Sequence, residues 1–171
     1  MATDLAVYGP FNIPFGPDPD TGKGKKITKE HVQDFWEEDG KKVRSKEGCW
    51  VFGLKIDRSI KPWYVGKTTD RFKDASLTPS KRTIYNKILA KSTRGKPVMF
   101  FVAPRGNAKS VPTASVSDLW VHLAQYAMAR NDKLRTVQSL KSVPKWSITG
   151  LVRSGAKPST EVKHFKKMLD I

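Results

Sequence analysis

The sequence predicts an α+β protein with a small, mostly antiparallel sheet of three strands flanked by helices. Two short strands rich in aromatic and β-branched residues lie close together at 49–56 and 63–67, and a third apolar run follows at 97–103. Helical periodicities alternate with these strands and give the order helix, strand, strand, helix, strand, helix, helix. We therefore expect an α+β sandwich with an N-terminal arm and helix and a C-terminal helix.

The first 26 residues are predicted to form an irregular arm because they are rich in Pro, Gly and Asp. Their apolar side chains, Phe11, Ile13 and Phe15, are expected to pack on the body of the protein. A helix follows from about Thr28, whose hydroxyl suits an N-cap, and Gly40 suits the end of that helix.

The two aromatic-rich strands are predicted at about Cys49–Ile56 and Trp63–Lys67. The segment between them, DRSIKP, is short enough to be the loop of an antiparallel hairpin. Thr78 and Pro79 then form an N-cap and first-turn pair for a helix that runs to about Lys91.

The third strand, Pro97–Ala103, is a continuous apolar run, which indicates burial on both faces. Apolar residues next recur at helical spacing over 116–128, where Ser115 or Ser117 can cap the helix. After a linker, a last helix is expected from about Ser159.

Positive charge is the strongest signal in the composition. The chain carries 32 Lys+Arg against 16 Asp+Glu, and the excess lies after residue 47, where 24 basic and 7 acidic residues give a net charge of +17. A field of this sign favours polyanions, because each neutralised phosphate releases condensed counterions. We therefore expect a nucleic-acid partner, with DNA favoured over RNA. The alternatives are a charged surface that serves only solubility and attraction to anionic lipid, and no basic amphipathic helix with a broad apolar face argues for the lipid.

Hydropathy and cysteine content exclude other classes. The mean hydropathy is −0.50 and no apolar run approaches the length of a membrane span, so we expect a soluble, cytoplasmic protein without membrane association. The lone Cys49 cannot form an internal disulfide, and no Cys/His cluster has zinc spacing. No small-molecule cofactor is expected.

The segments GCW at 48–50 and WYVGKT at 63–68 precede a helix, an apolar strand and a helix containing SDLW. This arrangement resembles the GIY-YIG endonuclease superfamily over about residues 48–136. The resemblance implies a three-stranded sheet flanked by helices and a mechanism in which one Mg²⁺ or Mn²⁺ ion assists cleavage of a phosphodiester bond. It divides the chain into an arm and helix at 1–47, the GIY-YIG-like domain, and a linker and helix at 137–171 that pack on the same domain.

In this family, the second-motif Tyr supports the site and an Arg or Lys stabilises the charge of the transition state. The second motif is intact here as Tyr64-Val65-Gly66, and Lys67 follows it. The position of the family Arg is open between Arg71, Lys81 and Arg82. If the centre is active, the resemblance makes Tyr64, Lys67 and Arg71 the candidate catalytic residues.

Two other family positions are altered. The first-motif Tyr, assigned to activating water, is Trp50, and the Glu that binds the metal is Trp120. Neither indole can deprotonate water or serve as a carboxylate ligand. Asp118 is a weak metal candidate, because it lies about 200° from Trp120 around the helix axis. The family Asn is either Asn131 or is lost at Thr136.

Several cations are expected to contact phosphate. Five cluster around one strand–helix connection, and two stand before the last helix, where a helix N-terminus can add to the attraction for an anion. These residues are Lys67, Arg71, Lys73, Lys81, Arg82, Arg153 and Lys157.

The sequence thus predicts a nucleic-acid-binding, GIY-YIG-like protein whose nuclease centre is degenerate and inactive. One alternative is an active endonuclease that depends on a divalent metal. Another is a protein-interaction module that uses a Trp-rich surface to regulate a protein partner.

Overall fold

The computed structural model describes residues 3–135, 146–151 and 156–171. Its strands are β1 (Thr3–Asn12), β2 (Gly48–Ile56), β3 (Ser59–Thr68), β4 (Lys96–Pro104) and β5 (Trp146–Ile148). They form one sheet in the order β3-β2-β4-β1-β5, in which only the β1–β5 pair is parallel. The α+β class and the mostly antiparallel sheet are therefore confirmed, whereas the expected number of three strands was wrong.

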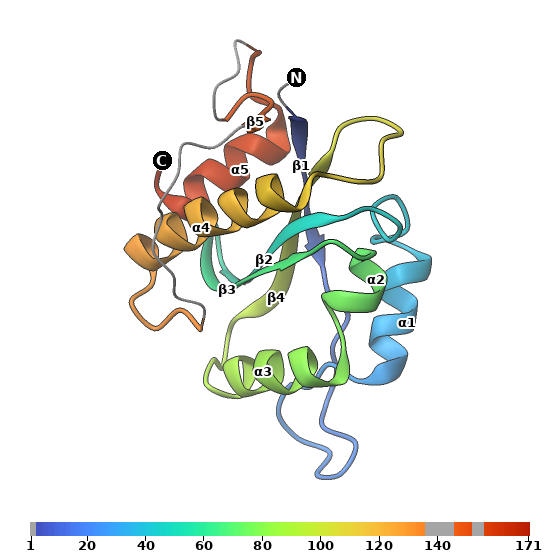
Figure 1. Ribbon diagram of the computed structural model, residues 1–171. Helices are drawn as coiled ribbons and strands as arrows, with labels where there is room; N and C mark the ends of the chain where they lie inside the picture. The colour runs from blue at the N-terminus through green and yellow to red at the C-terminus, as the bar shows by residue number, and fades with distance from the viewer. Residues whose placement is uncertain (1–2, 136–145, 152–155) are drawn as a thin grey trace.

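Helices cover both faces of the sheet (Figure 1). One face carries α1 (Lys29–Glu37), α2 (Phe72–Ala75) and α3 (Pro79–Ala90), and the other carries α4 (Thr113–Arg130) and α5 (Thr160–Leu169). Of the helices in these described ranges, none has the length and apolar character needed to cross a membrane.

Alternation along β2 divides the core into two clusters. Cys49 and Val51 point toward α4 and α5, whereas Trp50, Phe52 and Leu54 point toward α1, α2 and α3. β4 is buried along nearly its whole length, which confirms the burial on both faces expected from its apolar run. The two clusters make the sheet the middle layer of a three-layer sandwich.

The expectation of an irregular arm was wrong for residues 3–12, which form β1 between β4 and β5. Leu5 and Val7 alternate with polar or half-buried neighbours and enter the cluster under α4 and α5. The register with β4 shifts between Tyr8 and Phe11, so the Gly-Pro pair between them lies in an irregularity of the ladder. A Pro is tolerated at such a point because it need not donate a ladder hydrogen bond.

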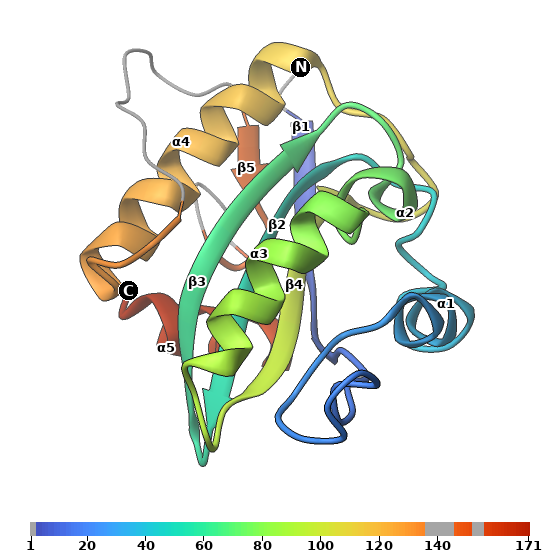
Figure 2. The ribbon, with the colours of Figure 1, turned by 90° about the horizontal axis from the view of Figure 1, so that it is seen from below.

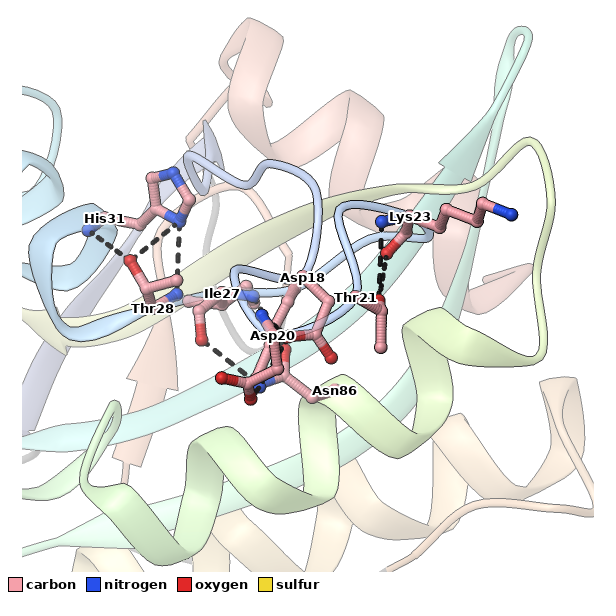
Figure 3. Close-up of polar contacts among 9 residues, drawn as sticks. Asp18, Asp20, Thr21, Lys23, Ile27, Thr28, His31 and Asn86 are labelled. Atoms are coloured by element: carbon pink, nitrogen blue, oxygen red, sulfur yellow. Dashed lines mark hydrogen bonds and ion pairs between the residues drawn. The ribbon is translucent and has the colours of Figure 1, made fainter.

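The loop that follows β1 is fastened to two helices (Figure 3). The side-chain amide of Asn86 on α3 accepts from the Ile27 N–H at 2.8 Å and donates to the Ile27 carbonyl at 3.1 Å. Thr28 then caps α1, because its hydroxyl accepts from the His31 N–H while the His31 ring accepts from the Thr28 N–H. The apolar side chains expected to pack on the body are buried or half-buried: Phe11, Ile13 and Phe15.

The β2–β3 hairpin is tighter than the expected six-residue loop. Its turn consists of Asp57 and Arg58, and β3 begins immediately afterwards at Ser59. Asp57 adopts a left-handed backbone with φ +53°, a conformation that Asp tolerates better than most residues.

A β-bulge interrupts the hairpin ladder. Phe52 pairs with Tyr64 and Gly53 pairs with Pro62, so Trp63 is an extra residue with no partner on β2. As a result, the adjacent side chains of Trp63 and Tyr64 both pack against the cluster under α1, α2 and α3. The bulge therefore places two adjacent side chains of β3 on the same side of the sheet, where regular alternation would place them on opposite sides.

Two of the predicted caps are confirmed, since the side chains of Thr28 and Thr78 each accept from a first-turn N–H. The last helix was expected from about Ser159, and α5 begins at Thr160 with Ser159 as its N-cap. The start of α4 was predicted wrongly. The helix begins at Thr113, so neither Ser115 nor Ser117 caps it. Its N-cap is Pro112, which supplies extended backbone without a side-chain hydrogen bond.

Candidate functional site

Two of the candidate residues, Tyr64 and Lys67, belong to β3, the edge strand that lies between α4 and α3 (Figure 2). Tyr64 packs on the α3 side of the sheet, whereas Lys67, three residues later, reaches α4 on the other side. The two residues that the sequence assigned to one site therefore lie on opposite sides of the same strand. Each makes its own contact with a helix.

On the α3 side, Tyr64 is paired with Lys81. The ammonium of Lys81 donates to the Tyr64 hydroxyl at 2.6 Å and lies 4.9 Å from the centroid of the phenol ring. Lys81 lies one turn before the buried Tyr85, so both side chains face the sheet. Of the three residues considered for the position of the family Arg, Lys81 is the one whose ammonium contacts Tyr64.

Trp50 is only 1% exposed, and its role is packing. Its indole N–H donates to the Tyr85 hydroxyl at 2.9 Å, and that hydroxyl donates to the Ser76 carbonyl at 3.0 Å. Burial keeps the pKa of Tyr85 well above its ordinary value, although the hydrogen bond from Trp50 acts in the opposite direction. A ring enclosed in this way cannot stack on a nucleobase.

On the α4 side, Lys67 contacts two residues of α4. Its ammonium donates to the Ser117 hydroxyl at 3.0 Å and lies 5.0 Å from the centroid of the half-buried Trp120 ring. The Trp120 indole in turn donates to the Val65 carbonyl of β3 at 2.9 Å. Trp120 thus packs on the core and also fastens α4 to the edge strand.

A pocket of about 320 Å³ opens beside Lys67 at the start of α4. Its lining combines the Lys67 ammonium with several hydroxyl groups and a single carboxylate, that of Asp70. The complete lining is Lys67, Thr68, Thr69, Asp70, Thr113, Val116 and Ser117. An ammonium surrounded by hydroxyl donors suits the oxygens of a phosphate group.

The other basic candidates of the strand–helix connection are less concentrated. Arg71 forms an ion pair with Asp74, with 2.6 Å between Nε and Oδ2, and Lys73 is exposed on α2. Arg82 lies near the loop after β1 and lines a pocket with Lys26 and Asn86. Arg71 therefore already has a counter-ion, and Arg82 lies apart from the Lys67 pocket.

The candidates near the C-terminus are only partly described. Lys157 is exposed shortly before α5, whereas Arg153 lies outside the described residues. Asp118 is half-buried on α4 and has interactions of its own. Asn131 is buried and donates to the Pro62 carbonyl at 2.7 Å, so its amide serves a structural purpose. Thr136, the other residue considered for that position, also lies outside the described residues.

Sequence reasoning missed Lys46, whose ammonium is buried at the turn between β4 and α4. It donates to the carbonyls of Pro104 at 3.0 Å, Gly106 at 2.7 Å and Ala108 at 2.7 Å. Burial, and to a lesser degree the charge of Lys109, lowers the pKa of Lys46. A basic run in a sequence gives no sign that one of its members is enclosed, so no local signal marks this residue.

The donor set at the family's metal position does not fit a divalent cation. Mg²⁺ and Mn²⁺ bind oxygen ligands, whereas Trp120 presents an N–H that is already donated to Val65. Among the residues that the structure describes, no three His, Cys, Asp or Glu side chains are grouped closely enough to hold a metal ion.

The site therefore consists of an edge strand with one lysine held on each of its sides, a hydroxyl-lined pocket, and two tryptophans whose N–H groups are engaged. Comparisons of the chain with protein-family models, curated proteins and solved structures give no match. The resemblance to the GIY-YIG superfamily stays a prediction.

Proposed function

We propose that this protein binds nucleic acid, with DNA favoured over RNA, along the edge formed by β3, α3 and α4, and that it does not cut the bound strand. The observation that carries the proposal is the pair of ammonium groups on the two sides of β3. Ser117 holds Lys67 on one side, and Tyr64 holds Lys81 on the other. Two cations held along one edge suit the regularly spaced charges of a phosphate backbone.

Both lysines are available for phosphate. Within the described residues neither forms an ion pair with a carboxylate, in contrast to Arg71, Arg94 and Arg130. Their partners are hydroxyl groups, which orient an ammonium without neutralising it. A phosphate that binds either lysine therefore interacts with a positive charge that no carboxylate neutralises. The net charge of +17 after residue 47 adds long-range attraction.

Binding without cleavage follows from the two indoles. The N–H groups of Trp50 and Trp120 donate to Tyr85 and Val65, and an indole offers no lone pair that could take a proton from water. The family-type reaction needs a general base and a carboxylate ligand at these two positions. With both absent from these positions, we expect the edge to hold a strand intact.

The proposal is tested by fluorescence anisotropy with labelled duplex DNA, single-stranded DNA and RNA over a series of salt concentrations. The wild-type affinity should fall steeply as salt rises. In the double variant Lys67→Gln/Lys81→Gln, affinity should fall about tenfold at low salt, and the slope of log K against log salt should decrease by about two.

The matched control is Lys29→Gln/Lys41→Gln, which removes two exposed lysines from the nearly neutral N-terminal part of the chain. Its affinity and salt slope should stay close to those of the wild type. Weak binding that does not depend on salt would refute the proposal. A protein partner retained at high salt in the absence of nucleic acid would instead favour the interaction-module alternative.

One observation favours the second candidate, an active endonuclease. The Tyr64 hydroxyl accepts from the Lys81 ammonium at 2.6 Å, and such a pair could assist proton transfer near a phosphate. Plasmid nicking with Mg²⁺ or Mn²⁺ distinguishes the two functions. We expect no nicking above the protein-free control, whereas metal-dependent nicking that is lost in Tyr64→Phe would establish the nuclease.

A further inference from the structure

A second pocket, of about 470 Å³, lies beside Trp63 of β3, between the end of α3 and the segment after α4. Its walls combine one aromatic ring with two apolar side chains, Ile88 and Leu134. The remaining polar groups include three cations and no carboxylate: Lys91, Lys133 and Arg135. The aromatic ring is that of Trp63, the extra residue of the β-bulge.

The bulge and one buried amide build this pocket. The bulge turns the half-buried Trp63 toward α3 and leaves the carbonyls of Pro62 and Trp63 at the outer edge of the sheet. Asn131 donates to the Pro62 carbonyl at 2.7 Å and accepts from the Lys133 N–H at 3.0 Å. The Arg135 N–H donates to the Trp63 carbonyl at 3.2 Å. The segment with two of the cations is therefore fastened beside the indole.

The charged groups of the pocket are available to a ligand. Within the described part of the chain, the side chains of Lys91, Lys133 and Arg135 have no ion-pair or hydrogen-bond partner. Lys61 makes a cation–π contact with Trp63, with 5.5 Å between Nζ and the ring centroid, which steadies the indole. The volume falls within the roughly 300–1,000 Å³ of pockets that hold small ligands.

We propose that this pocket takes one unpaired nucleotide of a nucleic-acid strand. The base lies against the indole of Trp63 and the apolar wall, and the flanking phosphates meet Lys91, Lys133 and Arg135. Aromatic stacking platforms beside cations are the common means of holding unpaired bases. A base inside a duplex has both faces covered by its neighbours, so the pocket selects single strands, overhangs or extruded bases.

This inference rests on the proposed function, because the strand must first bind the basic edge. It is tested with the full chain by comparing a labelled single-stranded oligodeoxynucleotide with a blunt duplex of the same sequence. Trp63→Leu should weaken binding of the single strand by about 5- to 150-fold and binding of the duplex by less than about twofold. Lys91→Gln/Arg135→Gln should also weaken the single strand more than the duplex.

Two controls separate this inference from the proposed function. Lys87→Gln, one turn before Lys91 on α3 and outside the pocket, should change neither affinity. Lys67→Gln/Lys81→Gln should weaken both forms of DNA together. If those lysine variants lose binding while Trp63→Leu and Lys91→Gln/Arg135→Gln leave the preference between the two forms unchanged, the inference fails and the proposed function stands. If the wild type binds neither form, both fail.

Photo-crosslinking gives a result that does not depend on the folding of any variant. A single strand that carries bromodeoxyuridine should crosslink to Trp63, as located by mass spectrometry of the tryptic peptides. Crosslinks confined to peptides that lack Trp63 would overturn the inference. Displacement of the strand by polyglutamate as effectively as by an oligonucleotide of equal charge would overturn it as well, because the pocket would then take an acidic peptide.

Discussion

The indole ring of Trp50 fills the space in front of Gly66, its cross-strand partner in the β2–β3 ladder. A methyl group at position 66 would clash with the six-membered part of that ring, and the ring is held in place by its hydrogen bond to Tyr85. The backbone of Gly66 is not left-handed, so the need for glycine here comes from packing.

Gly66→Ala should therefore destabilise the protein by about 1–3 kcal/mol through overpacking. In a Trp50→Phe background the same substitution should cost less than half as much, because the smaller ring leaves room for the methyl group. Urea unfolding followed by circular dichroism measures all four corners of the double-mutant cycle. Equal costs in the two backgrounds would show that another neighbour excludes the side chain.

The buried hydroxyl of Tyr85 links Trp50 to the Ser76 carbonyl. Tyr85→Phe leaves that N–H and that carbonyl without this partner and should cost about 1–3 kcal/mol at pH 7. Tyr126→Phe is a suitable control, because the half-buried Tyr126 hydroxyl makes no hydrogen bond to the described residues. A cost for Tyr85→Phe no larger than that for the control would contradict the prediction.

The same residue predicts a dependence on pH. Burial raises the pKa of Tyr85 well above its ordinary value of 10.0, so the folded protein keeps the phenol protonated where the unfolded chain ionises. This contribution to stability is complete below pH 10 and is lost as the pH rises toward the raised pKa. The difference in unfolding free energy between wild type and Tyr85→Phe should therefore shrink above pH 10, as urea titrations at several pH values can measure.

Cys49 should be unreactive in the folded protein. Its thiol is fully buried, donates to the Val116 carbonyl at 3.5 Å, and has a pKa raised by burial. A thiol-specific chromogenic reagent should label it only after addition of denaturant, then to one equivalent. Ser45→Cys adds an exposed thiol that should react at once. Rapid labelling of folded wild type would mean that β2 separates readily from α4.

Lys46→Met should destabilise the connection between β4 and α4. The substitution removes the ammonium that binds the carbonyls of Pro104, Gly106 and Ala108, at a cost of about 1–3 kcal/mol. Lys41→Met, at an exposed lysine of the same basic run, should change the unfolding free energy by less than about 0.5 kcal/mol. The midpoint temperatures of thermal unfolding of the two variants test this prediction. Similar midpoints for Lys46→Met and Lys41→Met would count against a structural role for Lys46.

Features with local causes were predictable from the sequence. Thr28 and Thr78 were recognised as caps because a hydroxyl and a first-turn N–H lie within three residues of each other. β4 was recognised because its apolar run is continuous. β1 was missed because a Gly-Pro pair interrupts its pattern, and its pairing with β4 depends on residues about 90 positions away.

The site was predictable as a set of residues but not as an arrangement. Tyr64, Lys67 and Lys81 were all named, yet the sequence could not reveal that Tyr64 and Lys67 lie on opposite sides of β3. The role of Trp63 was missed, because a bulge depends on the register between two strands rather than on any single residue.

Part of the outer edge of β3, at residues 62–65, is already occupied by hydrogen bonds from its own chain. The carbonyls of Pro62, Trp63 and Val65 accept hydrogen bonds from Asn131, Arg135 and Trp120. A strand from a second molecule would have to displace Trp120 of α4 and the segment after α4 before it could pair with these carbonyls, so strand addition at this part of β3 is disfavoured. Because these backbone groups are already used, a partner at this part of the edge would have to be recognised through side chains rather than through strand pairing.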